Sequence, residues 1–244
     1  MAKTLAQHWD GQASAWAAWA AEGRYDSYWS FHGDRFHALI PPPTGRAAAL
    51  DLACGEGRVG RRLAADGWLV TATDVSFALC EFASARGTTN VVQSSADRLP
   101  FADGAFDLAV AFMAFHDFDP GVVTSAFDEV ARILTPGGTL MLAVNHPTNS
   151  MLRPDRHDDG TVDFTVSHSY FEERPYENVV ERDGVSVAFR GIQRPLSTYI
   201  GRALGAGLRL EAIDEVSVPA PVSNGRGSAD WAKVPMFADM RFRR

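Results

Sequence analysis

Residues 50–60 read Leu-Asp-Leu-Ala-Cys-Gly-Glu-Gly-Arg-Val-Gly, and this stretch decides the fold. Its glycines, at positions 55, 57 and 60, have the spacing G-x-G-x-x-G and directly follow an apolar run that predicts a buried strand. A helical pattern follows from about residue 58 to 65. Glycine in a strand-to-helix turn permits positive φ and lets a ligand approach the backbone closely. Taken alone, this spacing predicts a dinucleotide site.

Strand-like and helical patterns alternate beyond the glycines. Further helices are predicted at 122–134 and 196–206. The predicted strands are 47–53, 68–75, 91–96, 106–112, 139–145, 208–218 and 234–242. Short strands that alternate with helices indicate parallel βαβ units with helices on both faces of the sheet, so we expect an α/β fold.

Two helical patterns precede this sheet and a β-rich stretch interrupts it. Apolar residues recur at spacings of three and four over residues 3–21 and 25–40. Between residues 147 and 195 the α/β alternation fails, and β-like runs predict an inserted cap. We therefore expect a single domain over residues 1–244. Its expected parts are a helical lid (1–43), a ligand-binding core (44–146), the cap (147–195) and a segment that completes the sheet (196–244).

Composition excludes several classes of protein. The chain has 23 Lys and Arg against 30 Asp and Glu, a net charge of −7, which argues against a nucleic-acid surface. Two cysteines do not make a disulfide framework and fit a reducing compartment. No stretch approaches the ~20 apolar residues of a membrane helix, and the start does not read as a signal peptide. We expect a cytoplasmic protein with no membrane partner and no metal site.

Three aspartates at predicted strand ends narrow the kind of ligand. Asp51 ends the first strand, where its charge would repel the pyrophosphate of a dinucleotide and attract a cation. Asp74 ends the second strand, where an acid commonly accepts hydrogen bonds from both ribose hydroxyls. Asp97 follows the third strand and can accept from an adenine amino group. Together they fit a ligand with ammonium, ribose and adenine parts and no phosphate, a description that S-adenosylmethionine meets.

These motifs resemble those of the class I S-adenosylmethionine-dependent methyltransferases, in their small, mostly bacterial branch that acts on small molecules. The resemblance covers nearly the whole chain and rests on residues 51–58, 73–76, 97–101 and 106–108 and on Arg132-Ile-Leu-Thr-Pro-Gly-Gly-Thr. It implies a Rossmann-like seven-stranded, mostly parallel sheet with an antiparallel last strand. It also implies S-adenosylmethionine as cofactor, S-adenosylhomocysteine as product and a small-molecule substrate.

The resemblance further implies which residues hold the cofactor. Asp51 would bind the methionine ammonium and Asp74 the ribose, while Asp97 and the amide of Arg98 would hold adenine. The predicted cofactor-binding residues are Asp51, Ala53, Gly55, Gly57, Asp74, Val75, Asp97, Arg98, Leu99, Ala111, Phe112 and Met113. Arg58 and the two arginines that follow it in the sequence are expected to form a solvated helix face instead.

Two histidines are candidates for proton transfer. Methyl transfer is an in-line displacement, so alignment supplies most of the catalysis and a general base is needed only when the acceptor carries a proton. His116, beside Asp117, follows the fourth strand, and His146 ends the fifth. Both lie at the edge where α/β sheets bind ligands, and histidine is the usual base near neutral pH. We predict His116 and His146 as catalytic residues; the alternative is that each only hydrogen-bonds a loop backbone.

Residues 193–199, Gln-Arg-Pro-Leu-Ser-Thr-Tyr, resemble the H-R-P-L-x-x-Y stretch that follows the cap in this branch, with Gln193 in place of histidine. If the histidine of the branch acts as a base, this chain has lost that base; if it only hydrogen-bonds the substrate, Gln193 can take its place. Aromatic residues of the N-terminal helices, including Trp16, Trp19 and Tyr25, could close over the cofactor; the alternative, favoured for most of them, is that they pack the two helices on the sheet. The predicted substrate-binding residues are Tyr28, Trp29, His32, His168, Tyr170, Phe171 and Gln193.

Two other functions stay open at this level. The Gln193 replacement motivates a methyltransferase-like protein that binds the cofactor without transferring its methyl group. The glycine spacing by itself motivates an NAD(P)-dependent oxidoreductase. The sequence also leaves open whether the methyl acceptor is an oxygen, nitrogen or carbon atom.

Overall fold

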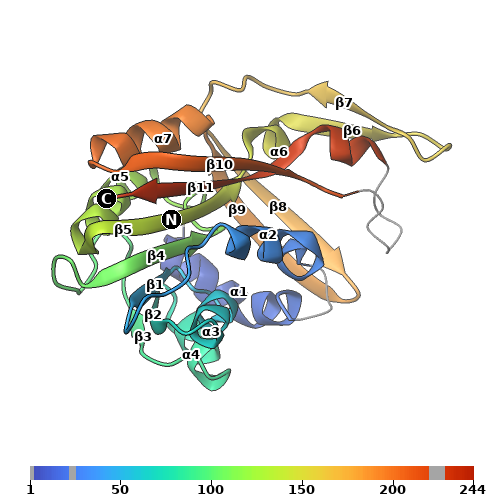
Figure 1. Ribbon diagram of the computed structural model, residues 1–244. Coiled ribbons are helices and arrows are strands. Elements are labelled where there is room, and N and C mark those ends of the chain that lie inside the picture. The colour runs from blue at the N-terminus through green and yellow to red at the C-terminus, as the bar shows by residue number, and fades with distance from the viewer. Residues whose placement is uncertain (1–2, 22–25, 220–228) are drawn as a thin grey trace.

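Seven strands form one sheet in the order β10-β11-β5-β4-β1-β2-β3 in the computed structural model, which describes residues 3–21, 26–219 and 229–244 (Figure 1). Their bounds are β1 (Ala48–Leu52), β2 (Leu69–Asp74), β3 (Val91–Gln93), β4 (Phe106–Phe112), β5 (Leu134–Asn145), β10 (Arg209–Ser217) and β11 (Pro235–Arg243). All neighbouring pairs from β3 to β5 are parallel, and β11 runs antiparallel to both β5 and β10. The expected α/β sheet with an antiparallel last strand is confirmed.

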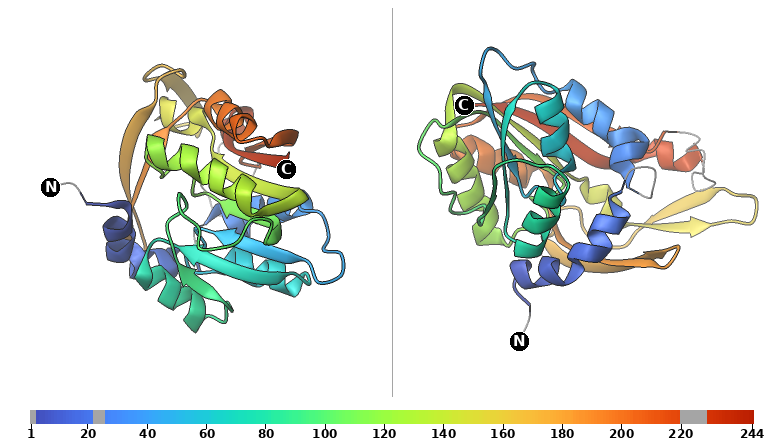
Figure 2. Two further views of the ribbon diagram at one scale, coloured as in Figure 1. Left: turned by 90° about the vertical axis from the view of Figure 1, so that its left-hand side faces the viewer. Right: turned by 90° about the horizontal axis from the view of Figure 1, so that it is seen from below.

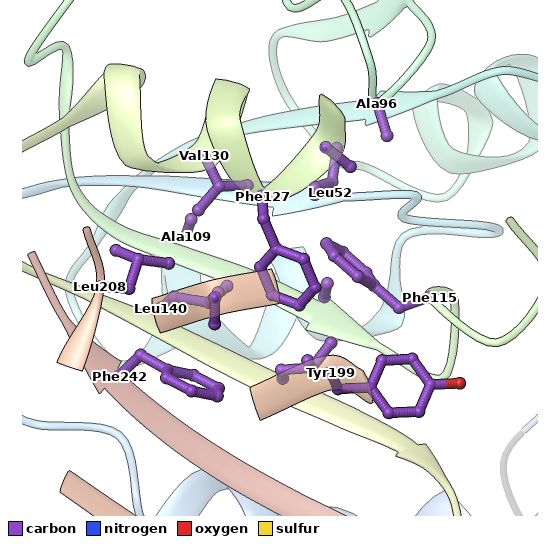
Figure 3. Packing of buried hydrophobic residues seen from close by; sticks show 14 of the residues in the cluster. Leu52, Ala96, Ala109, Phe115, Phe127, Val130, Leu140, Tyr199, Leu208 and Phe242 are labelled. Atoms are coloured by element: carbon purple, nitrogen blue, oxygen red, sulfur yellow. The ribbon is translucent and has the colours of Figure 1, made fainter. Parts of the chain in front are cut away.

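Helices cover both faces of this sheet (Figure 2). The core helices are α3 (Arg58–Ala65), α4 (Phe77–Ala85), α5 (Pro120–Ile133) and α7 (Leu196–Gly205). Helices α5 and α7 pack on one face, where Phe127 and Tyr199 lie against Leu52 and Leu140 of the strands (Figure 3). Helix α3 packs on the other face, where Val59 and Leu63 meet apolar side chains of β2 and β4. Helix α4 lies beside β2, and the sequence patterns did not predict a helix there.

Pairing by β11 extends β5 further than the sequence predicts. The Pro-Gly-Gly turn was expected before a strand at 139–145, yet β5 begins at Leu134. Backbone bonds hold this early part, because Gly137 donates to the carbonyl of Arg244 at 3.1 Å and Arg244 donates to that of Gly138 at 2.9 Å. The antiparallel neighbour therefore keeps the glycines in the sheet.

The N-terminal segment forms α1 (Leu5–Trp19), a π-helical turn η1 (Tyr28–His32) and α2 (Gly33–Ala38). The single helix expected over 25–40 is thus two pieces, and Tyr25 lies outside the described residues. A Cβ atom at Gly33 would lie 2.6 Å from the carbonyl oxygen of Tyr28, so the tight turn depends on glycine. No helix within the described ranges has both the length and the apolar character that membrane crossing requires.

The stretch between β5 and α7 contains a short helix and two hairpins. They are α6 (Pro147–Met151), β6 (Leu152–Arg156) with β7 (Val162–Val166), and β8 (Arg174–Arg182) with β9 (Val185–Gln193). Asp183 and Gly184 join β8 to β9 with φ of 48° and 79°, which is the two-residue turn that matches strand twist. The long β8–β9 hairpin reaches back across the sheet edge to α1 (Figure 1).

Candidate active site

A cavity of about 440 Å³ lies at the carboxyl ends of the central strands. Helix α1 contributes one wall, through Leu5, Trp9, Trp16 and Trp19. The β8–β9 hairpin contributes another, through Tyr176, Asn178, Val180, Arg182, Phe189 and Arg190. The floor contains the glycine turn and the residues that follow β2, β4 and β5. A site enclosed in this way is sized for a small ligand.

The glycine turn between β1 and α3 lies close to helix α1, which we call the lid. Gly55 and Gly57 have φ of 57° and 86°, a region that glycine adopts without a steric penalty. A Cβ atom at Gly55 would lie 3.0 Å from the indole nitrogen of Trp16. The absence of that Cβ therefore lets α1 lie directly against the turn. Ala53 and Gly55 line the cavity, whereas Gly57 faces Thr88 and does not.

Asp51 is a buried carboxylate at the end of β1. Its Oδ2 accepts the backbone N–H of Gly60 at 2.7 Å, and only 2% of the residue is exposed. Burial raises the pKa of Asp51 to about 7, and the nearby charges of Asp74 and Glu56 act in the same direction. A ligand cation beside Asp51 would lower its pKa and so oppose both effects.

Asp74 is held in place by two backbone donors. Its Oδ1 accepts from Ser76 and its Oδ2 from Gly55, each at 2.9 Å. Burial raises the pKa of this carboxyl to about 6, against the lowering effect of those hydrogen bonds. Its fixed orientation leaves lone pairs that could accept two ligand hydroxyls.

These two carboxylates fit the cofactor that the sequence indicates. Neither Asp51 nor Asp74 forms an ion pair with another described residue; their partners are backbone N–H groups. Buried carboxylates without a counter-ion are costly and favour a positively charged ligand. A ligand with an ammonium, a sulfonium and two ribose hydroxyls would supply the missing charge and donors.

The segment after β3 lies outside the lining of the cavity and borders a separate small hollow. A smaller hollow of about 20 Å³ is lined by Val75 and by Ser94, Ser95 and Ala96. Asp97 and Arg98 do not line it, and the amide of Arg98 already donates to the carbonyl of Ser95 at 3.1 Å. The assignment of adenine to Asp97 and Arg98 stays a prediction, and the residues of this loop that line the hollow come earlier in the sequence.

Leu99 and Ala111 are core residues. The side chain of Leu99 packs in the hydrophobic core, and its backbone amide donates to Glu129 at 2.7 Å while its carbonyl accepts from Arg132 at 3.1 Å. Ala111 is fully buried within β4. Phe112 and Met113, at the end of that strand, do line the cavity.

His116 lies in the cavity wall next to Asp117. Its Nε2 lies 3.4 Å from Oδ1 of Asp117, and its Nδ1 is buried without a hydrogen bond to any described residue. Burial lowers the pKa of His116 to about 3 and raises the pKa of Asp117 well above its usual range. The loop is fixed from behind by Arg194, which donates to the carbonyl of Phe115 at 3.2 Å.

His146 lies outside the cavity lining. Its Nδ1 accepts the amide of Thr148 at 3.2 Å, which caps α6, and its Nε2 lies 2.8 Å from Oε1 of Glu215. Both ring nitrogens are therefore occupied. The structure supports the alternative for this histidine, a hydrogen-bonding role in the loop, and Asn145 next to it lines the cavity instead.

The predicted substrate contacts from the N-terminal segment also lie behind the wall. The hydroxyl of Tyr28 contacts Nε2 of His37 at 2.9 Å, and Trp29 donates to the carbonyl of Ala20 at 2.8 Å. His32 is fully buried, 2.8 Å from Asp239, and stacks on Phe237, which does line the cavity. Hydrogen bonds within the fold thus occupy these polar groups.

The predicted cap contacts are similarly absent from the cavity lining. Gln193 accepts from Ser150 and contacts Nε2 of His168, and it donates to the carbonyl of Ser169 at 3.1 Å. The hydroxyl of Tyr170 accepts the amide of Leu196 at 3.2 Å. Phe171 is 83% exposed. Gln193 ties the cap together, so its replacement of histidine does not remove a group from the cavity.

Two residues near the cavity, Arg58 and Tyr176, have positions that the sequence did not predict. Arg58 was expected to be solvated, yet it is buried, 3.0 Å from Asp26 and stacked over Tyr28 and Trp16. Tyr176 enters from the hairpin, and its hydroxyl accepts from Asn145 at 2.8 Å. These contacts join segments far apart in the sequence, so no local pattern could show them. Within the described residues, no group of three or more metal-ligating side chains is arranged to hold a metal ion.

The sequence and fold are similar to those of known methyltransferases. Residues 50–142 match the family model described as a methyltransferase domain. An uncharacterised methyltransferase of Synechocystis sp. is 37% identical over 131 residues, which are 50% of this chain and 59% of that protein. A demethylmenaquinone methyltransferase of Beutenbergia cavernae is 37% identical over 95 residues, 38% of this chain and 39% of that protein. The chain therefore spans less than two thirds of these relatives.

Solved structures resemble nearly the whole fold. An S-adenosylmethionine-dependent methyltransferase from Mesorhizobium loti aligns with a TM-score of 0.70 at 22% identity, covering 90% of this chain and 98% of that one. A putative enzyme of the same description from Listeria monocytogenes aligns with a TM-score of 0.68 at 20% identity, covering 86% and 96%. Residues 50–142 therefore match a methyltransferase domain by sequence, and the strand order of the sheet is that of a fold shared with S-adenosylmethionine-dependent methyltransferases.

Proposed function

We propose that this chain transfers a methyl group from S-adenosylmethionine to a small-molecule acceptor held between α1 and the β8–β9 hairpin. The observation that carries the proposal is the pair of buried carboxylates, Asp51 and Asp74, beside the glycine turn. Their charge favours a cationic ligand with hydroxyl donors. A nicotinamide dinucleotide would bring its pyrophosphate against the same carboxylates, which disfavours the oxidoreductase alternative.

In this proposal the residues of the chain bind and orient the cofactor and the acceptor. S-adenosylmethionine supplies, when bound, a methyl group already activated on sulfur. Asp51 would hold its ammonium, Asp74 its ribose, and Val75 would cover one side of its adenine. Met113 would lie near the sulfonium. Helix α1 and the β8–β9 hairpin enclose the cavity, exclude water and restrict the directions from which the acceptor can approach. Such alignment of the acceptor with the methyl group is the main source of rate acceleration in an in-line displacement.

His116 is the residue that we propose for proton transfer, because it is the predicted base that lines the cavity. Its lowered pKa keeps the imidazole neutral at physiological pH, so a ring nitrogen can accept a hydrogen bond. An ionised Asp117, 3.4 Å away, would raise that pKa and with it the capacity of the ring to accept a proton. An enclosed cavity also suits a small organic acceptor and not a nucleic acid. The cytoplasmic location stays a prediction from the sequence.

Calorimetry with S-adenosylhomocysteine and NADH tests the proposal at the level of binding. We expect binding of S-adenosylhomocysteine and none of NADH. Incubation with labelled S-adenosylmethionine and an acceptor library then tests transfer, with label expected in at least one small molecule. Binding of NADH alone would contradict the cofactor assignment, and cofactor binding without transfer to any acceptor would favour the non-catalytic alternative.

A further inference from the structure

We infer that the methyl acceptor is an amine that binds as its ammonium form, with the carboxylate of Asp117 as its counter-charge and the imidazole of His116 as the receiver of its proton. This inference rests on the proposed function and adds the substrate class. It comes from the polar groups that the loop after β4 contributes to the cavity lining.

Asp117 is a cavity-lining carboxylate without a cationic partner. It is 7% exposed, and its Oδ2 accepts the indole N–H of Trp9 at 3.1 Å. No lysine or arginine of the described ranges forms an ion pair with it, and Nε2 of His116 lies 3.4 Å from its Oδ1. Burial raises the pKa of Asp117, which means that the empty site disfavours its charge. A ligand cation would restore that charge by compensating it.

The arginines near this carboxylate are directed elsewhere. Arg190 extends toward Asp119, with 3.8 Å between Nη2 and Oδ1. Arg194 is buried and donates to the carbonyls of Phe115 and Phe118, while its Nε lies 3.3 Å from Glu173. Both guanidinium groups lower the pKa of Asp117 from a distance, yet neither neutralises it by contact.

His116 has the capacity to take a proton. Its Nδ1 is buried and has no hydrogen bond to a described residue, and its Nε2 faces Oδ1 of Asp117 outside hydrogen-bond geometry. Burial keeps this ring neutral in the empty site. When a bound ammonium passes its proton to the imidazole, the positive charge stays beside the same carboxylate. The transfer therefore creates no additional buried charge.

The transfer balances without another reactant. The N–H bond of the ammonium breaks and its proton moves to His116, which frees the nitrogen lone pair. That lone pair forms the N–C bond as the C–S bond breaks and its electron pair stays on sulfur. The products are a methylated ammonium and S-adenosylhomocysteine. Asp117 stabilises the positive charge that develops on nitrogen as it is lost from sulfur.

The same arrangement discriminates between acceptor classes. A carboxylic acid brings a negative charge next to Asp117 and an alcohol brings no charge, so neither would compensate an ionised Asp117 as an ammonium does. The aromatic wall, which includes Trp9, Tyr176 and Phe189, suits a ring attached to the amine. Three probes of matched size therefore separate the classes: 2-phenylethylamine, 2-phenylethanol and 3-phenylpropionate.

Calorimetry of these probes against the protein saturated with S-adenosylhomocysteine tests the inference. We expect the amine to bind at least tenfold more tightly than the alcohol or the acid. Asp117→Asn should reduce amine affinity at least tenfold and leave affinity for S-adenosylhomocysteine unchanged, whereas Asp128→Asn, at an exposed position of α5, should leave both unchanged.

Three results would overturn the inference. They are equal or tighter binding of the alcohol or acid, an amine preference that survives Asp117→Asn, and no binding of the amine while S-adenosylhomocysteine binds. The wild-type comparison decides the matter even where the variant does not fold. Failure of S-adenosylhomocysteine itself to bind would instead contradict the proposed function, so the two failures are distinguishable.

Discussion

The indole nitrogen of Trp9 donates to Oδ2 of Asp117 at 3.1 Å, and this bond joins α1 to the loop after β4. Helix α1 is also attached on its hairpin side. Nε2 of His8 lies 2.9 Å from the carbonyl oxygen of Ala188, and the amide of Ala188 donates to Gln12 at 2.9 Å. The lid is therefore fixed to both the floor and the wall of the cavity.

Trp9→Phe should loosen the lid. The substitution keeps an aromatic ring but leaves a buried acceptor on Asp117 without its donor, which costs about 1–3 kcal/mol. We expect a lower melting temperature and faster proteolysis at α1. Trp16→Phe is the matched control, because Trp16 contacts Phe189 and Trp9 through ring packing and its indole makes no hydrogen bond to the described residues. Equal proteolysis of the two variants would show that the bond does not hold the lid.

Asp74→Asn should weaken cofactor binding about tenfold or more, because hydrogen bonds to a charged acceptor are worth about 1.5–3 kcal/mol. Calorimetry with S-adenosylhomocysteine measures the effect. Asp107→Asn is a suitable control at the opposite end of the sheet, where Asp107 accepts from the amide of Ala48 at 3.0 Å and from Thr135 at 3.2 Å. Asp107→Asn should leave affinity unchanged; wild-type affinity in Asp74→Asn would show that the ribose lies elsewhere.

Affinity for S-adenosylmethionine should fall as the pH is lowered. The pKa of Asp51 is raised to about 7 and that of Asp74 to about 6, and each group must be ionised to receive its part of the cofactor. Below the pKa of Asp51, affinity loses about tenfold per pH unit through that group alone. 5′-Methylthioadenosine lacks the ammonium, so its affinity should decline only below about pH 6. Identical pH profiles for both ligands would contradict the assignment of Asp51 to the ammonium.

Asp51→Asn should stabilise the ligand-free protein at alkaline pH. A carboxyl whose pKa rises from 3.8 to about 7 on folding holds its proton in the folded state, so its contribution to stability falls as pH rises from about 4 to 7. Above pH 7 the folded protein bears the full cost of the buried charge on Asp51. Replacing Asp51 by Asn removes that charge and should raise the free energy of unfolding by about 1–4 kcal/mol. Denaturant unfolding should show the gain at pH 8 and none at pH 4. A less stable variant at pH 8 would contradict this sign.

Local patterns predicted the sheet and the cofactor end of the site because those features follow from short stretches of sequence. Strand β4 was predicted with its observed bounds, and Asp51 and Asp74 could be placed because parallel strands end at the same edge of a sheet. Tyr28, His32 and Gln193 were assigned to the substrate because they are polar or aromatic residues in segments expected near the site. The structure shows each of them bonded within the fold, which depends on partners such as His37, Asp239 and Ser150 that no spacing rule identifies.

The contacts between α1, the loop after β4 and the β8–β9 hairpin were harder to predict because they join segments distant in sequence. Trp9 reaches Asp117, and Asn145 donates to Tyr176. Arg58 was taken for a surface residue because it follows the glycine turn among other arginines, yet a carboxylate and two aromatic rings enclose it. Side-chain direction in such cases is set by tertiary packing, which periodicity does not contain.

Gly57→Ala should destabilise the protein more than the same change at another glycine with positive φ. Gly57 has φ of 86°, and an added Cβ would collide with Oγ1 of Thr88, whereas Gly137 has φ of 80° and nothing within 4 Å of that position. Gly137→Ala therefore reports the backbone strain alone, about 1–3 kcal/mol, and Gly57→Ala adds the collision. Thr88→Ala removes the colliding atom, so the double variant should recover most of the difference between the two glycine changes. Denaturant unfolding of the four variants measures these differences. Equal losses at Gly57 and Gly137 would mean that the glycine turn can move away from Thr88, and that its shape is set by the lid and the carboxylates instead.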